Sequence, residues 1–201
     1  MRCTNILLGG LKVTVIGYGF CGRGTAICLR NLGAHVTVVE QDPLTKLDAH
    51  LEGFHVADLE AAVSGASMIV TVTGRAGILG KEHFLELKDG VILVNAGHFE
   101  TEIDVPGLRG IATVYDEIRK NIDSFKLKNG RKVFLLAKGN PVNLAGADGN
   151  PIEVMDLGLA LQTLSLVYLV ENAGKMENIA QNIPAQVERK VSKMAVSAWT
   201  S

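Results

Sequence analysis

The sequence predicts an α/β protein with a doubly wound parallel sheet, followed by a C-terminal hairpin and two C-terminal helices. Three observations carry this prediction. Short apolar runs rich in β-branched residues alternate with helical segments over the first half of the chain. A glycine-rich turn directly follows the first run, and a long apolar segment lies near the C-terminus. Regular alternation of strands and helices is typical of right-handed βαβ units and a parallel sheet.

The first half supplies four strands and four helices. Each expected strand is apolar almost throughout, as in strands that are buried on both faces. We expect strands at residues 12–16, 36–39, 68–72 and 91–94, and helices at residues 25–32, 44–51, 59–63 and 82–87.

The pattern changes after about residue 100. We expect further strands at residues 111–114, 124–127 and 132–136, with Asn129-Gly130 predicting a type I′ hairpin turn between the last two. A loop rich in glycine, asparagine and proline follows at residues 139–151, then helices at 152–171 and about 184–194. We therefore expect a dinucleotide-binding domain over residues 1–150 and a helical packing or oligomerisation segment over residues 151–201.

The long helix expected at residues 152–171 is apolar nearly all round, and such a helix must be covered on every side. Another domain or a second copy of the chain would provide that cover, and self-association, most simply as a dimer, is the expected result. The alternative is that this chain's own sheet covers the helix. Its most apolar part, residues 157–170, is too short to span a bilayer, so no membrane partner is expected.

Composition excludes several functional classes. Hydrophobic residues make up 47% of the 201 residues, and the formal net charge is −1 without a basic stripe, so we expect no nucleic-acid partner. Cys3, Cys21 and Cys28 lack metal-ligand spacing and are odd in number. This predicts neither a disulfide framework nor a metal site, and it favours a cytoplasmic protein with reduced thiols.

A glycine pattern follows the first strand and opens the first helix. Gly17-Tyr18-Gly19-Phe20-Cys21-Gly22 matches G-x-G-x-x-G in the context that makes the pattern a dinucleotide signal, and so predicts a Rossmann-type fold. The first glycine permits the tight turn, the second the approach of a pyrophosphate, and the third close packing of helix on strand. The phosphates would lie at the amino end of the helix. The alternative is that the glycines only turn the chain.

An acidic residue ends the second strand, roughly 20 residues beyond the first glycine, where a carboxylate receives the adenosine ribose hydroxyls. Glu40 is our candidate for this role, and its charge would favour NAD over NADP. Asp42 competes for the role, but we expect it to cap the next helix.

Two further strand ends carry polar loops. Ligands of such sheets bind at the carboxyl ends of the strands. Thr73, with Gly74 beside it, could therefore face the adenosine side. Asn95 and His98, with Ala96 and Gly97 between them, could reach the nicotinamide end. For His98 the alternative is a loop histidine of no special role.

Several blocks together resemble the NAD-binding domain of S-adenosylhomocysteine hydrolases of archaeal and bacterial type. The similarity covers nearly the whole chain. Its blocks are the glycine loop through Cys21-Gly22-Arg23-Gly24, Glu40-Gln41-Asp42-Pro43 with Glu52-Gly53-Phe54, Asn95-Ala96-Gly97-His98-Phe99 with Glu102-Ile103-Asp104-Val105, and Asn129-Gly130-Arg131 leading to Leu135-Leu136-Ala137 and Val142-Asn143-Leu144.

The resemblance implies a function and site residues. Family members hydrolyse S-adenosylhomocysteine reversibly to adenosine and homocysteine, using bound NAD to oxidise the ribose 3′-hydroxyl transiently. It implies that Glu40 binds the NAD ribose, that Thr73 and Asn95 line the cofactor cleft, and that Asn143 contacts the nicotinamide carboxamide. His98 would be the one catalytic residue, near the substrate ribose.

The sequence also departs from the family. The substrate domain that precedes the Rossmann domain in family enzymes has no counterpart, so we expect a natural truncation, one half of a split enzyme or an expressed fragment. Lys138 stands where the family has glutamate, and Asn150 where it has a histidine that approaches the substrate. We therefore expect a hydrolase NAD domain that is inactive alone. The alternatives are a freestanding NAD-binding or NAD-sensing module and, disfavoured by the lack of an Arg/Glu/His set, a small hydroxy-acid dehydrogenase.

Overall fold

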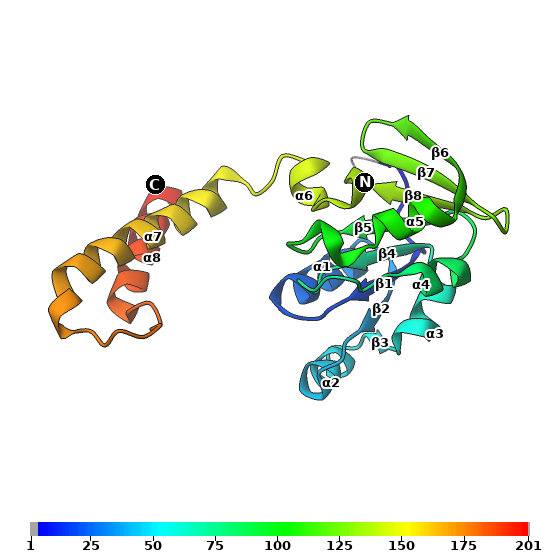
Figure 1. Ribbon diagram of the computed structural model, residues 1–201. Coiled ribbons are helices and arrows are strands. Elements are labelled where there is room, and N and C mark those ends of the chain that lie inside the picture. Colours follow the sequence, from blue (N-terminus) through cyan, green and yellow to red (C-terminus); the bar gives the residue numbers. More distant parts are fainter. Residues whose placement is uncertain (1–3, 201) are drawn as a thin grey trace. The chain divides into compact units, whose positions relative to one another are not determined.

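The computed structural model describes residues 4–200, and within them the chain forms two compact units that divide between Asp148 and Gly149 (Figure 1). The first unit contains the sheet, and the second contains the two long C-terminal helices.

The first unit is built on an eight-stranded sheet with the strand order β3-β2-β1-β4-β5-β8-β7-β6. The six strands from β3 to β8 in that order pair in parallel, and β8, β7 and β6 pair antiparallel. The strands are β1 Lys12–Ile16, β2 His35–Val39, β3 His55–Val56, β4 Met68–Thr71, β5 Val91–Asn95, β6 Ala112–Arg119, β7 Ile122–Leu127 and β8 Lys132–Leu136. The predicted α/β fold with a doubly wound sheet is confirmed.

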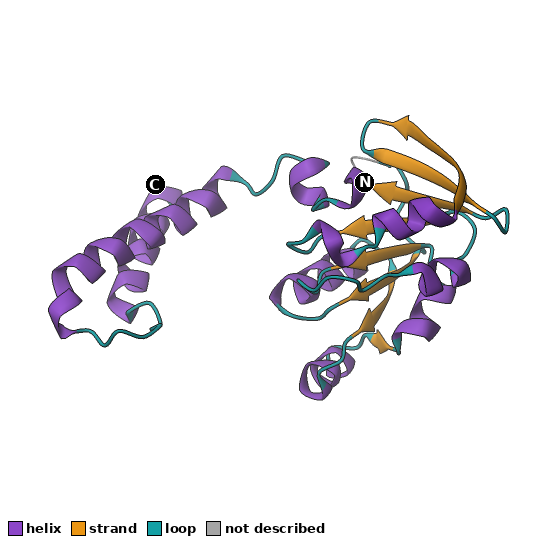
Figure 2. Ribbon diagram, viewed as in Figure 1, coloured by secondary structure: helices purple, strands orange, loops and turns teal. Residues whose placement is uncertain are grey.

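Helices cover both faces of this sheet (Figure 2). One apolar cluster joins Ile16 and Ile69 of the sheet to α3, α4 and α5, and the other joins Val15 and Val38 to α1 and α2. The helices of this unit are α1 Phe20–Asn31, α2 Pro43–Leu51, α3 Leu59–Ser64, α4 Lys81–Glu86, α5 Val105–Ile111 and α6 Val142–Ala145, with 3₁₀ turns η1 Glu100–Glu102 and η2 Ala137–Gly139.

Some expected boundaries are wrong. Helix α1 begins at Phe20 rather than at residue 25. Glycine has a poor helix propensity, which argues against a helix at position 22, but close packing on Gly17 requires a glycine there. Ile111 ends a helix, and strand β6 starts only at Ala112. The short α5, α6 and β3 have no counterpart among the expected elements.

The hairpin between β7 and β8 forms, but its turn is not type I′. Gly130 has a φ of +85°, whereas Asn129 is not among the described residues with positive φ, and a type I′ turn requires both. The amide of Gly130 donates to Leu127 O at 2.9 Å, and Leu127 N donates to Arg131 O at 2.8 Å. The connection is therefore one residue longer than predicted, with glycine in the left-handed position that closes three-residue hairpin loops.

The second unit consists of α7 Ile152–Asn172, the 3₁₀ turn η3 Ala173–Lys175 and α8 Ala185–Trp199. No residue of α7 is buried, and α8 buries only Val187 and Val191. The continuous helix Ile152–Lys175, 24 residues long with a mean hydropathy of 1.4, is long and apolar enough to cross a membrane by length and composition alone. The expectation concerns residues 157–170 alone, which form part of this longer helix, and core helices of soluble proteins meet the same criterion.

Candidate cofactor-binding site

The turn between β1 and α1 requires glycine at two positions. Gly17 has a φ of +101°, and a Cβ there would lie 2.9 Å from the carbonyl oxygen of Val72. A Cβ on Gly22 would overlap the carbonyl oxygen of Gly17. These contacts hold the first turn of α1 directly against the ends of β1 and β4.

Gly19 differs from these two because its backbone conformation does not require a glycine. Its φ of −65° suits any residue, and a Cβ there would meet nothing within 4 Å. Gly19 is the N-cap of α1, no side chain caps that helix end, and its first turn contains no acidic residue. An open space thus faces the amide groups at the positive end of a helix, which is the environment that binds phosphate.

The side chains next to Gly19 point elsewhere. Phe20 is 99% exposed and Cys21 is exposed, so neither contributes to the core. Tyr18 is buried instead, with its ring edge-on to Phe54 and its hydroxyl donating to Glu52 at 2.9 Å. Burial, and then this hydrogen bond, raise the pKa of Tyr18 to about 12. Its side chain therefore anchors the loop, and only its backbone faces Glu40.

Glu40 joins the end of β2 to the glycine turn. Its Oε2 accepts the amide of Tyr18 at 2.8 Å, and its Oε1 accepts the amides of Gln41 and Asp42 at 2.7 and 3.1 Å. Three donors fix the carboxylate while it remains half-exposed. A carboxylate has about four acceptor sites, so one is left for a ligand hydroxyl.

Asp42, the rival candidate, serves as the N-cap of α2. Its Oδ2 accepts the backbone amide of Thr45 at 2.8 Å and the Thr45 hydroxyl at 2.7 Å. The Thr45 side chain and then its amide hold the pKa of Asp42 below its ordinary value. The prediction that Asp42 caps this helix is confirmed.

A cleft of about 630 Å³ lies at the carboxyl ends of β1, β2 and β4. It brings together four expected residues, Gly17, Gly19, Glu40 and Thr73. The sequence interpretation missed the others that line it: Ile16, Val39, Gln41, Lys46, Asp58, Leu59, Glu60, Val72, Arg75 and Ile78. Most of these end a strand, follow one or begin α3, and that position is the signal that could have identified them.

The loop after β4 is held by a buried glutamate that the sequence indicates only as part of a family block. Glu102 is fully buried. Its Oε2 accepts the amide and the hydroxyl of Thr73, both at 2.9 Å, and its Oε1 accepts the amide of Gly74 at 2.8 Å. A Cβ on Gly97 would overlap the same carboxylate. Glu102 therefore fastens the loop after β4 beside the loop after β5.

Asn95, at the end of β5, is also fully buried. Its Nδ2 donates to the carbonyls of Phe99 and Gly139 at 2.8 and 2.9 Å, and its Oδ1 accepts the amide of Gly97 at 2.8 Å. Contact of this side chain with a cofactor would require these bonds to open. Within the protein, Asn95 joins the loop after β5 to the 3₁₀ turn η2 after β8.

His98 and Asn143 are exposed on segments near Asn95 and do not line the cleft. His98 packs edge-on against Phe99, with ring centroids 4.8 Å apart. Asn143 lies on α6, shortly after Pro141, which forms a parallel bridge with Asn95. Ala96 is half-buried in the same loop and donates its amide to Thr71 O at 2.8 Å.

The two side chains that depart from the family pattern, Lys138 and Asn150, contact other residues of this chain. Lys138 Nζ pairs with Glu117 Oε2 of β6 at 3.4 Å, so the changed charge has an acidic neighbour. Asn150 is exposed and its amide approaches Met155 Sδ at 3.8 Å. Among residues 4–200, no group of three or more His, Cys, Asp or Glu side chains could hold a metal ion.

The family model and the curated relatives agree on one family. The family model for the S-adenosyl-L-homocysteine hydrolase NAD binding domain matches residues 1–149. The chain is 45% identical over 197 residues to the adenosylhomocysteinase of Sulfurisphaera tokodaii, covering 98% of this chain and 48% of that protein. It is 44% identical over 198 residues to the adenosylhomocysteinase of Thermotoga maritima, covering 98% and 49%. The chain thus spans about half the length of the curated relatives it matches.

Among solved structures, a dipicolinate synthase from Bacillus halodurans is similar with a TM-score of 0.50. The match is 15% identical and covers 53% of this chain and 38% of that one. At this identity the likeness concerns the fold alone.

Proposed function

This chain belongs to the S-adenosyl-L-homocysteine hydrolase family through its NAD-binding domain, and on that premise we propose that it holds NAD for a hydrolase reaction of the adenosylhomocysteinase type. The observation that carries the proposal is the placement of Glu40 against the glycine turn. The carboxylate that would receive ribose hydroxyls accepts the amide of Tyr18, one residue from the open space at Gly19. In this proposal a ribose site at Glu40 and a phosphate site at Gly19 share one cleft.

The residues of the cleft fit the parts of NAD. The amides at the start of α1 would hold the pyrophosphate, and Gly19 would let it approach the backbone. Glu40 would accept from the adenosine ribose and would repel a 2′-phosphate, which favours NAD over NADP. Thr73 and Gly74, fastened by Glu102, would form the wall beside β4. When bound, NAD supplies a hydride acceptor for a sugar carbinol.

The residues near Asn95 would lie at the nicotinamide end of the cofactor, opposite the adenosine. We infer that Asn95 positions the loop of Ala96, Gly97 and His98 rather than contacting the cofactor, since its amide is fully used within the protein. Exposed His98 and Asn143 would then be free to meet the nicotinamide and the substrate sugar. Tyr18 would contribute through its backbone, and Phe20 and Cys21 through the helix end on which they lie.

Turnover, in this proposal, needs the part of such an enzyme that binds S-adenosylhomocysteine or adenosine. The supporting facts are the identity to whole adenosylhomocysteinases and the half-length match. We further propose that residues 151–201 form a packing segment, with the unburied α7 associating in a homo-oligomer of a cytoplasmic protein. A freestanding NAD-binding module is the competing function.

Two measurements test the proposal. Calorimetric titration with NAD and NADP should show saturable binding of NAD and much weaker binding of NADP; no NAD binding by folded protein would reject it. Supplying the substrate-binding half of a related adenosylhomocysteinase should then yield homocysteine release from S-adenosylhomocysteine. NAD binding with no turnover under these conditions would favour the freestanding module.

A further inference from the structure

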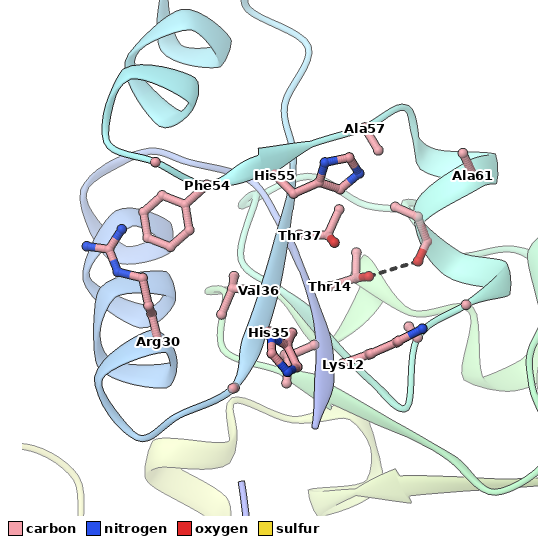
Figure 3. A pocket seen from close by; sticks show the side chains of 16 residues that line it. Lys12, Thr14, Arg30, His35, Val36, Thr37, Phe54, His55, Ala57 and Ala61 are labelled. Atoms are coloured by element: carbon pink, nitrogen blue, oxygen red, sulfur yellow. Dashed lines mark hydrogen bonds between the residues drawn. The ribbon is translucent and has the colours of Figure 1, made fainter. Parts of the chain in front are cut away.

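A second cavity, of about 610 Å³, lies at the other end of the strands from the cofactor cleft (Figure 3). It is lined by the amino-terminal parts of β1 and β2, by β3, and by residues around α3. We call it the basic groove, after Lys12, His35 and His55, which line it together with Thr14 and Thr37. Nothing in the proposed function uses it.

Strand register places these five side chains on one face of the sheet. Lys12 pairs with His35, Thr14 with Thr37, and Thr37 with His55. Side chains two residues apart on a strand share a face, and paired residues of neighbouring strands lie about 4.8 Å apart. Lys12 and His35 therefore form one row and Thr14, Thr37 and His55 the next. In Figure 3, Thr14, Thr37 and His55 lie on the side of β2 that faces Ala61.

The polarity of this face is unusual for its position. Strands of a parallel sheet are normally apolar on both faces because helices cover both. Here the part of the chain that covers the rows contributes small residues, namely Ala57, Ala61, Ala62, Gly65 and Ala66. Small side chains leave the space open, and Lys12, His35 and His55 all remain exposed.

The charge of the basic groove has one sign. No acidic side chain is among the described residues that line it. The carboxylates of Asp58 and Glu60 line the cofactor cleft instead, and Asp58 is paired with Lys46 at 2.9 Å. Arg30 also lines the groove, but it stacks over the Phe54 ring at 4.3 Å and donates to Glu52 O at 2.7 Å.

Lys12, His35 and His55 are therefore the basic side chains available to a ligand, since none of them is hydrogen-bonded or ion-paired through its side chain to another described residue. From this arrangement we propose that the basic groove binds a small phosphate-bearing anion. The Lys12 ammonium would bind phosphate as a point charge, and the two imidazoles on the same face of the sheet offer ring N–H donors to the other phosphate oxygens. The Thr37 hydroxyl adds a neutral donor beside them.

The test uses the 201-residue chain saturated with NAD, so that the cofactor cleft is filled. Inorganic phosphate and adenosine 5′-monophosphate are titrated separately, with the histidine ring protons followed by NMR and assigned from His35→Gln and His55→Gln. We expect saturable shifts of the His35 and His55 signals, while His50 and His83 do not shift. Equal affinity for both probes identifies phosphate itself as the ligand, and tighter binding of the nucleotide identifies a phosphate monoester.

A matched pair of variants tests the role of the lysine. Lys12→Met should weaken phosphate binding about tenfold through loss of a charged donor. Lys132→Met changes another exposed lysine, at the start of β8 and outside the basic groove, and should leave phosphate binding unchanged. Equal effects of the two variants, or no saturable histidine shift with either probe, would overturn the proposal. Failure to bind NAD would reject the proposed function but leave the inorganic phosphate measurement valid.

Discussion

Replacement of Glu102 tests the idea that a buried carboxylate holds the cofactor-site loop after β4. In Glu102→Gln the amide oxygen can still accept both bonds from Thr73 if it takes the place of Oε2. The amide nitrogen then faces the backbone amide of Gly74, which donates to Oε1 at 2.8 Å in the unsubstituted protein. Two donors would oppose each other in a fully buried position.

The expected cost follows from these contacts. A hydrogen bond to a charged acceptor contributes about 1.5–3 kcal/mol, and a buried donor left unpaired costs about 1–3 kcal/mol. Since the two describe the same lost contact, we expect Glu102→Gln to lower the free energy of unfolding by about 2–3 kcal/mol. Glu102→Ala removes all three bonds and leaves a cavity, and should cost roughly 3–5 kcal/mol. At about 2–4 °C for each kcal/mol, the Gln variant melts roughly 4–12 °C lower.

Calorimetric melting with and without NAD provides the assay, and Glu100→Gln provides the control. Glu100 lies in the same 3₁₀ turn, η1, but is exposed, so its replacement should change the melting temperature little. Glu102→Gln should also bind NAD more weakly, because a loosened Thr73–Gly74 loop must be ordered on binding. A melting temperature no lower than that of Glu100→Gln would refute the reasoning.

Three further predictions concern the glycine turn and its surroundings. Gly19→Val should fold normally, since the φ of Gly19 and its surroundings permit a side chain. Its affinity for NAD, measured by calorimetry, should fall about 100-fold, because the displaced pyrophosphate loses two backbone hydrogen bonds of about 1.5 kcal/mol each. Unchanged affinity would reject the phosphate assignment. Glu40→Ala should lower the affinity for NAD about tenfold and relax discrimination against NADP. Asp42→Ala should instead destabilise α2 without changing cofactor preference. The reverse pattern would transfer the ribose role to Asp42. Hydrogen bonds from Arg23 and then Tyr18 hold the pKa of Glu52 below its ordinary value of 4.5, so Glu52 stabilises the fold above that pH and less as the pH falls through the lowered pKa. Glu52→Gln should accordingly lower the melting temperature at pH 6, with a difference that shrinks below pH 4.5; a difference that grows in acid would contradict this sign.

Local patterns account for what could be predicted of the fold and the cleft. The strand from Lys12, the turn at Gly17 and the acidic residue at position 40 are all read from spacing and residue type, and the structure brings Gly17, Gly19, Glu40 and Thr73 into one cleft. Asn129-Gly130 predicts the hairpin, but its turn type depends on a backbone angle that the residue pair alone does not determine.

Contacts between distant segments could not be predicted in the same way. Glu102 looks like one more acidic residue in a loop, and only its approach to Thr73 and Gly74 makes it a buried acceptor. The sequence suggests that Asn95 presents its amide to a ligand, whereas tertiary contacts with Phe99 and Gly139 occupy that amide. Such roles depend on which loops meet at the edge of the sheet.

The sequence alone determines the α/β class, the dinucleotide turn and the family, because these follow from short-range spacing and from ordered blocks of residues. The folded chain is needed to show which side chains are buried acceptors and which face open space. It also places Lys12, His35 and His55 in neighbouring positions on three strands, although they are far apart along the chain. The physical reason is that strand register and loop packing, rather than sequence distance, determine which charges and hydrogen-bonding groups come within reach of one another.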